Sequence, residues 1–148
     1  MAQNLREQIA QNIITVLKNM EDPTPVLVTR EPFQVQELAI TQFPALLITA
    51  EREERTTITM GTPGTGRRQG SIEFRIQGFV RGTELDRKRN DLIERIEEAL
   101  DSDRYRTLAA EGVIDSQITV IEVIERQPPL AEIAIIFTVR YNYLRTAT

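Results

Sequence analysis

The most regular alternation of hydrophobic and polar positions lies near the end of the chain, over residues 130–144. Every second residue from Ala131 to Tyr143 is apolar, and the residues between them become polar toward the end. This period of two predicts a long β-strand with one covered face. At about 3.3 Å per residue the strand would span about 50 Å, whereas a compact domain of this length is about 38 Å across. We expect either a sharp bend or an end, residues 140–143, that leaves the domain to meet another molecule.

Two segments repeat their apolar residues at helical spacing, and shorter ones are typical of strands. Residues 5–20 and 85–100 each place an apolar stripe on one face, which predicts two amphipathic helices. Asn4 is placed to cap the first helix, and residues 83–86 (TELD) resemble a capping box at the start of the second. Besides the last strand, the sequence predicts strands at residues 26–28, 45–50, 72–80 and 118–124. Residues 33–41 fit either a strand or a loop.

Together these elements predict an α+β fold. The order is helix, strands, helix and two strands, and the hairpins imply mostly antiparallel pairing. The two amphipathic helices would pack on one face of the sheet, giving two layers in a single domain of residues 1–148. Gly78, on the apolar face of its strand, marks either a bulge or a close packing contact. Within residues 33–41, the side chains available for burial are Val35, Leu38 and Ile40.

The apolar strand at residues 45–50 continues into five charged residues, Glu51, Arg52, Glu53, Glu54 and Arg55. A strand that continues through them is charged on both faces. This half of the strand is therefore either a solvated sheet edge, where charge discourages unwanted pairing, or a surface that meets charges of another chain.

A glycine-rich connection at residues 59–70 is longer than hairpin closure requires, and we expect it to be flexible. Within it, residues 61–68 (GTPGTGRR) resemble a phosphate-binding P-loop, which needs a lysine, a hydroxyl and a helix directly after it. Arg67 and Arg68 occupy the lysine and hydroxyl positions, and a strand follows. The two arginines are available to a carboxylate-bearing partner instead, and a nucleotide-binding enzyme stays the remote alternative.

Composition excludes several kinds of chemistry. The chain has no cysteine and no histidine, which removes disulfides, thiolate nucleophiles, histidine bases and most zinc sites. Its formal net charge of −4 argues against a general nucleic-acid binder. Lys18 and Lys88 are the only lysines among 18 basic residues, and arginine is favoured at interfaces, although a codon or habitat bias explains this equally well. We expect no enzymatic activity and no cofactor.

The first residues lack the apolar region of a signal peptide, and no run of residues approaches a transmembrane span. The sequence therefore predicts a soluble protein made in a cytoplasm, without a membrane partner.

Several local phrases, taken in order, resemble the tail terminator (tail completion) proteins of long-tailed bacteriophages. They are FPALLI at residues 43–48, the glycine-rich hairpin, DLIERIEEAL at 91–100, DRYRTL at 103–108 and FTVRYNY at 137–143. The resemblance implies a small subunit that forms a hexameric ring on the last layer of the tail tube. It also implies that the ring stops tube polymerisation and presents a surface to the head–neck connector, with no catalytic residue.

The resemblance therefore names partners: other copies of the chain, the tail tube protein and the head–neck connector protein. DNA would pass through the ring without specific binding, and the net negative charge suits such a conduit. The protein would be assembled in the host cytoplasm and found in the virion, at the neck-proximal end of the tail. A neck or stopper subunit, or a tail tube subunit of the same virion, remains the alternative.

The residues predicted to meet a partner or a neighbouring subunit come from the charged strand extension, the glycine-rich connection and the end of the last strand. They are Glu51, Arg52, Glu53, Glu54, Arg55, Arg67, Arg68, Arg140, Tyr141 and Tyr143.

Overall fold

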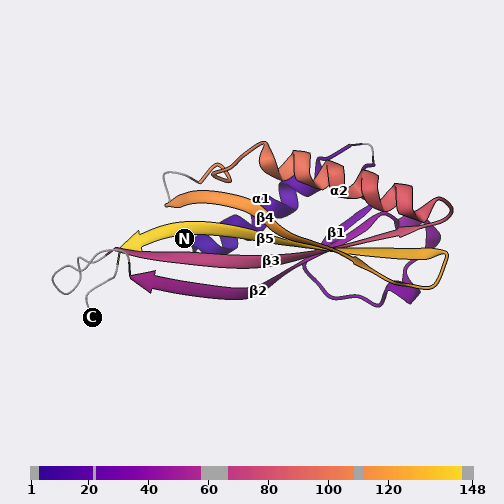
Figure 1. The fold of residues 1–148 in the computed structure, drawn as a ribbon, viewed down its shortest axis with the longest axis horizontal. Coiled ribbons are helices and arrows are strands. Elements are labelled where there is room, and N and C mark those ends of the chain that lie inside the picture. Colours follow the sequence, from indigo (N-terminus) through magenta and orange to yellow (C-terminus); the bar gives the residue numbers. More distant parts are fainter. Residues whose placement is uncertain (1–3, 22, 58–66, 109–111, 145–148) are drawn as a thin grey trace.

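The computed structural model describes residues 4–21, 23–57, 67–108 and 112–144. Five strands form one sheet in the order β1-β2-β3-β5-β4 (Figure 1). β1 runs parallel to β2, and every other neighbouring pair is antiparallel. The elements, in chain order, are α1 (Leu5–Lys18), β1 (Leu27–Thr29), β2 (Ala45–Thr57), β3 (Arg67–Arg81), α2 (Leu85–Asp101), β4 (Val113–Ile124) and β5 (Leu130–Leu144). This arrangement confirms the predicted α+β class.

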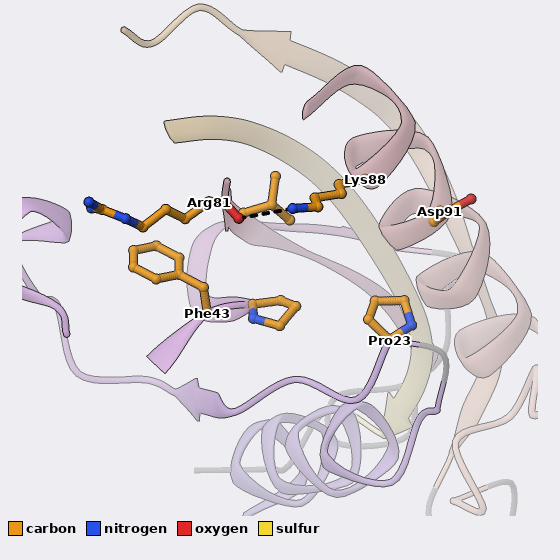
Figure 2. A pocket seen from close by; sticks show the side chains of 7 residues that line it. Pro23, Phe43, Arg81, Lys88 and Asp91 are labelled. Carbon is orange, nitrogen blue, oxygen red and sulfur yellow. Dashed lines mark hydrogen bonds between the residues drawn. The ribbon is translucent and has the colours of Figure 1, made fainter. Parts of the chain in front are cut away.

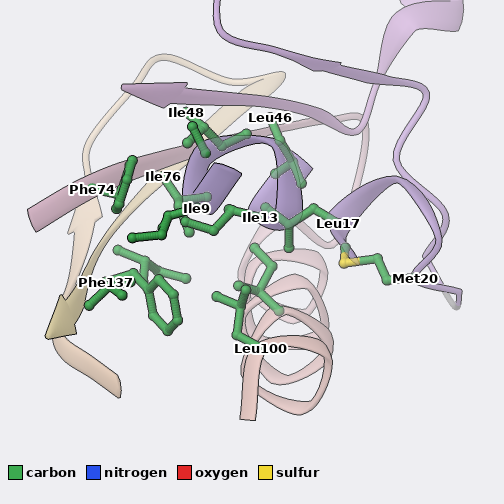
Figure 3. Packing of buried hydrophobic residues seen from close by; sticks show 14 of the residues in the cluster. Ile9, Ile13, Leu17, Met20, Leu46, Ile48, Phe74, Ile76, Leu100 and Phe137 are labelled. Carbon is green, nitrogen blue, oxygen red and sulfur yellow. The ribbon is translucent and has the colours of Figure 1, made fainter. Parts of the chain in front are cut away.

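The main core lies between the two helices and one face of the sheet. The apolar stripes predicted from helical spacing are the buried ones: Ile9, Ile13 and Leu17 in α1, and Leu92, Ile96 and Leu100 in α2. They pack against alternate residues of the inner strands, as Figure 3 shows for Ile48, Ile76 and Phe137. Asn4 caps α1 as predicted, because its side chain accepts a hydrogen bond of 2.8 Å from the Glu7 amide.

A second, smaller core lies on the opposite face, at the end of the sheet where β2 begins. Residues 33–41 form neither a strand nor an open loop here, since they contain two short 3₁₀ helices, Val35–Glu37 and Ile40–Gln42. Val35 is buried beside Ala45 and Phe79. Ile40 was expected to be available for burial, but it is 71% exposed.

The long last strand neither bends away nor leaves the sheet alone. β5 pairs with β3 along its whole length, from Leu130 opposite Arg81 to Leu144 opposite Arg67. β5 is one continuous strand of 15 residues, and its end lies past the helices together with the end of β2 and the start of β3 (Figure 1). This agrees with the second of the two expected outcomes, and that residues 140–143 meet another molecule stays a prediction.

Three further expectations need correction. The capping box at residues 83–86 does not form, because Glu84 precedes α2 in a left-handed conformation (φ 52°) without a side-chain cap. Residues 67–70, assigned to the glycine-rich connection, belong to β3; the rest of that connection, residues 58–66, lies outside the described residues, as does its expected flexibility. β4 begins five residues earlier than predicted.

In the described part of the chain, no helix is long and apolar enough to cross a membrane.

Gly78 marks close packing rather than a bulge. A Cβ atom at this position would lie 2.9 Å from side-chain atoms of both Ile133 and Leu92. The pairing of β3 continues without a shift through Gly78, and the irregularity lies on β2, between Ala50 and Arg52. The glycine lets α2 approach the sheet closely.

Candidate functional site

A polar cluster with Glu53 at its centre joins α1, β2 and β5. It lies where β2, β3 and β5 run past the helices. The Glu53 carboxylate accepts hydrogen bonds from Arg6 Nε at 2.6 Å, Arg55 Nε at 2.8 Å and the Tyr141 hydroxyl at 2.8 Å. After the irregularity in β2, Glu53 stands opposite Ile72, a residue of the main core. The carboxylate therefore points to the face that carries α1, where Arg6 reaches it.

The electrostatics of this cluster favour the charged form of the carboxylate. The hydrogen bond from Arg6, followed by those from Tyr141 and Arg55, lowers the pKa of Glu53 to about 2. Burial, followed by the bond to Glu53, raises the pKa of the Tyr141 hydroxyl. At neutral pH the cluster is thus a fixed anion held by two guanidinium groups. Such a carboxylate is poorly suited to act as a general base, because its donors already occupy it.

Aromatic side chains complete the surface beside Glu53. The ring of Tyr141 lies against Gly70, where an added Cβ would be 2.2 Å from Tyr141 Cζ. The centroids of the Tyr141 and Tyr143 rings are 5.8 Å apart, and the Arg55 guanidinium carbon lies 4.6 Å from the Tyr143 centroid. Tyrosine and arginine are enriched in protein interfaces. We name this surface, made of Arg6, Glu53, Arg55, Tyr141 and Tyr143, the sheet-end cluster.

The ten predicted interface residues fall on two faces of the sheet because a strand alternates its side chains. Glu53, Arg55, Tyr141 and Tyr143 lie on the helix face, together with Arg68, which stands directly opposite Tyr143. Residues whose register places them on the other face are Arg52, Glu54 and Arg140. Arg52 forms an ion pair with Glu54, and Glu51 Oε1 lies 3.9 Å from Arg75 Nε. The Arg67 side chain lies outside the described part.

Sequence reasoning missed two members of this arrangement. Arg6 is 47 residues from Glu53, and nothing in the local pattern connects them. Gly70 was assigned to the connection between strands, although its place opposite Tyr141 is what leaves room for the aromatic ring. The packing of α1 reveals the role of Arg6, and the register of β3 and β5 reveals that of Gly70.

The edge strand β4 exposes apolar side chains on both of its faces. Val120, Ile121 and Val123 are 42%, 42% and 52% exposed. Ile121 stands opposite Ile135 on the helix face, and Val120 stands opposite Ile136 on the other face. Unpaired backbone groups beside apolar side chains favour the addition of another strand or another protein surface. The sequence predicted this strand but gave no signal that it lies at the edge.

A pocket of about 400 Å³ lies beside the start of α2. Pro23, Phe43, Pro44 and Val80 supply its apolar walls, and Lys88 and Asp91 line it from α2. The Lys88 Nζ donates a hydrogen bond of 3.3 Å to the main-chain oxygen of Arg81. Figure 2 shows Pro23 and Phe43 on opposite sides, with Lys88 reaching between them from the helix. Four separate segments build the pocket, so the sequence did not reveal it.

The described residues offer little for metal or acid–base chemistry. Among them, no group of three or more acidic side chains lies close enough together to hold a metal ion. A second groove of about 450 Å³, between α1 and β2, is lined by charges that are already paired, such as Arg30 Nη1 with Glu7 Oε2 at 2.8 Å.

Comparison with known proteins shows a similar fold but no matching family. No family model matches the chain, and no curated protein matches it in sequence. A chain in the structure of the virion of a native gene transfer agent particle is similar in fold, with a TM-score of 0.51 and 9% sequence identity. The match covers 94% of this chain and 95% of that one. At this identity the likeness shows a shared fold over nearly the whole length.

Proposed function

We propose that the chain is a structural virion protein, and specifically a tail terminator subunit. Copies of it form a ring that caps the phage tail tube, ends tube polymerisation and provides the joint to the head and neck. The observation that carries the proposal is the fold, which is shared over 94% of the chain with a chain of a virion particle. The ordered sequence phrases that resemble tail terminators select this role among virion proteins.

The surfaces of the molecule support a role in assembly. The exposed apolar strand β4 lies at one edge of the sheet, whereas the charged part of β2 lies near the other edge, beyond the three residues that pair with β1. Two different surfaces of one subunit can meet in head-to-tail contacts, which form a ring when the rotation between neighbours closes. The sheet-end cluster adds arginine and tyrosine side chains of the kind that protein interfaces favour.

The partners follow from this role: further copies of the chain, the tail tube protein and the head–neck connector protein. DNA passes through the ring without specific binding, which the net charge of −4 favours. The subunit belongs to the neck-proximal end of the tail and acts without catalysis. The carboxylate of Glu53, whose pKa is lowered to about 2, accepts hydrogen bonds from two arginines and is therefore not free to react.

Two alternatives are separated from this proposal by assembly behaviour. A tail tube subunit polymerises alone into long tubes, whereas a terminator stops at one ring. A neck or stopper subunit binds the connector without shortening tubes.

The nucleotide-binding alternative rests on residues 61–68, most of which lie outside the described residues, and β3 begins at Arg67 where a P-loop needs a helix. Micromolar ATP affinity that is lost in Arg67→Ala would favour it.

The experiment that tests the proposal follows tube growth. Tail tube protein is polymerised with and without the purified chain, and tube lengths are measured by electron microscopy. A terminator shortens the tubes in proportion to its concentration and leaves a single extra ring at one end. Raising the salt concentration should weaken this capping, because exposed ion pairs are screened. Tubes that grow to the same length with a monomeric chain in solution contradict the proposal.

A further inference from the structure

The turn that follows α2 is held rigidly by a buried arginine. Arg106 is fully buried, and its Nε donates a hydrogen bond of 2.7 Å to the main-chain oxygen of Asp103. Its Nη2 donates to the main-chain oxygens of Leu100 and Asp103, and its guanidinium carbon lies 5.4 Å from the Phe137 ring centroid. One side chain thus ties the end of α2 to the turn and to β5.

The backbone of this turn is strained as well as fixed. Arg106 and Thr107 both have a left-handed conformation, with φ of 53° and 54°. Non-glycine residues rarely adopt it, and such a conformation persists where the surrounding structure holds the backbone in place, as the hydrogen bonds of Arg106 do here. On the other side, Ser116 Oγ donates a hydrogen bond of 2.7 Å to the main-chain oxygen of Arg104. The turn is therefore anchored to both α2 and β4.

The anchored turn presents Tyr105 to the outside. Tyr105 is 44% exposed, and the side chain of Arg104, next to it, is 64% exposed. Arg104 Nε is bound to Asp115 Oδ1 at 2.7 Å, and its guanidinium carbon is 5.8 Å from the Tyr105 ring centroid. A rigid tyrosine beside an arginine loses little conformational entropy on binding, which makes it a strong anchor for an interface.

The pocket beside the start of α2 has the complementary chemistry. Its apolar walls include Pro23, Phe43 and Val80, and its volume of about 400 Å³ can accommodate an aromatic ring. Lys88 offers a donor to a phenol oxygen, and the exposed Asp91 offers a carboxylate to a guanidinium. Arg81 lines the pocket as well, and Figure 2 shows it on the side away from Asp91, so a guanidinium of the partner has to approach from the Asp91 side. The ring and hydroxyl of Tyr105 match the apolar walls and Lys88, and Arg104 matches Asp91.

We propose that Tyr105 of one copy inserts into this pocket of the next copy, with its hydroxyl accepting from Lys88 and with Arg104 paired to Asp91. The inference rests on the proposed ring and names its subunit contact. Tyr105 follows the last residue of α2, whereas the pocket lies beside the first two turns of this helix, which has 17 residues and is about 25 Å long. The contact is therefore head-to-tail, and it builds a ring when the rotation between neighbouring copies closes.

Single cysteines test this geometry directly, because the natural chain has none. Asp91→Cys and Arg104→Cys are purified separately, mixed with tail tubes and treated with a short bis-maleimide crosslinker, because the Cα atoms of an arginine–carboxylate pair lie farther apart than the roughly 7 Å that a disulfide spans. The proposal predicts a crosslinked dimer in the mixture and only background levels in either protein alone. If rings form on the tubes and the mixture shows no more dimer than the separate proteins, the contact is not the proposed one.

Charge exchange gives an independent test. Asp91→Arg and Arg104→Glu should each raise the protein concentration needed for half-maximal capping at least tenfold, and the double variant should recover most of the loss. Tyr105→Ala should act like the single variants, while Glu94→Arg, exposed on α2 outside the pocket, should not. Circular dichroism checks folding of each variant. Unchanged capping by Arg104→Glu and Tyr105→Ala refutes this contact alone. If the natural chain never caps tubes, the proposed function fails with it.

Discussion

The hydroxyl of Tyr141 donates a hydrogen bond of 2.8 Å to Glu53, linking the end of β5 to β2 across the intervening strand β3. The link exists because β3 has a glycine, Gly70, directly opposite Tyr141, so the aromatic ring can lie over the backbone. Arg6 continues the connection to α1 through the same carboxylate. The part of the sheet that runs past the helices is thereby braced from within the subunit.

Replacing Glu53 by glutamine should make stability less dependent on pH. The pKa of Glu53 is lowered from 4.5 to about 2, so its ionisation stabilises the fold above pH 4.5, and this contribution disappears as the pH falls through about 2. At pH 7 we expect Glu53→Gln to lose about 1–2 kcal/mol, a figure reduced for the solvent exposure of its arginine partners. Urea unfolding at pH 7, 4 and 2 measures the effect.

The pH range over which the stability difference disappears tests the assignment to Glu53. The natural protein and Glu53→Gln should differ at pH 7 and converge near pH 2, where the carboxylate takes up its proton. The matched control is Glu54→Gln, whose side chain is 61% exposed and is paired with Arg52. A difference between the natural protein and Glu53→Gln that stays constant from pH 7 to 2 would contradict the assignment.

Adding one methyl group at Gly70 should displace the Tyr141 ring. The Cβ of alanine would lie 2.2 Å from Tyr141 Cζ, so the ring must move and its bond to Glu53 is lost. We expect Gly70→Ala to cost about 2 kcal/mol of folding stability. In the Tyr141→Ala background the same substitution should cost much less. Equal costs in both backgrounds would show that the ring does not occupy this position.

Loss of the Arg106 guanidinium should destabilise the turn that presents Tyr105. In Arg106→Met the buried main-chain oxygens of Leu100 and Asp103 lose their side-chain donor, which we expect to cost about 2–4 kcal/mol in thermal or urea unfolding. Arg87→Met, at a side chain that is 75% exposed on α2, should change stability by less than about 0.5 kcal/mol. Similar small effects for both variants would remove Arg106 from its anchoring role.

Much of the fold could be predicted from the sequence because its strongest patterns are local. The period of two over residues 130–144 and the helical stripe with Leu92, Ile96 and Leu100 correspond to β5 and to the buried face of α2. The capping box failed because Glu84 takes a left-handed conformation just after Gly82, whose φ is 125°, where the chain turns from β3 into α2. Capping sequences describe only the local preference.

The candidate interface was predicted less well because its partners are distant in sequence. The charged residues 51–55 were identified as a group, but an irregularity in β2 and the alternation of the strand divide them between two faces. The binding of Glu53 by Arg6 depends on where α1 packs, and the pocket near Lys88 depends on four segments. No periodicity records such contacts.

Lysine substitutions on the edge strand should weaken assembly without weakening the fold. Val120 and Val123 are 42% and 52% exposed, so Val120→Lys and Val123→Lys should change the free energy of unfolding by less than about 1 kcal/mol. A lysine on an edge strand opposes pairing with another chain, so both variants should cap tubes poorly. Gln127→Lys, exposed just after β4, adds the same single positive charge and is the charge-matched control. Normal capping by both valine variants would assign β4 to free surface.

The most direct test of the account is electron cryomicroscopy of tail tubes incubated with the purified chain. The account predicts one closed ring of this chain, most simply of six subunits, at a single end of each tube, with subunits in head-to-tail contact. Shorter tubes should accompany higher occupancy of that end. Long tubes built from this chain alone, or tubes whose ends carry none of it at saturating concentration, would contradict the central claim.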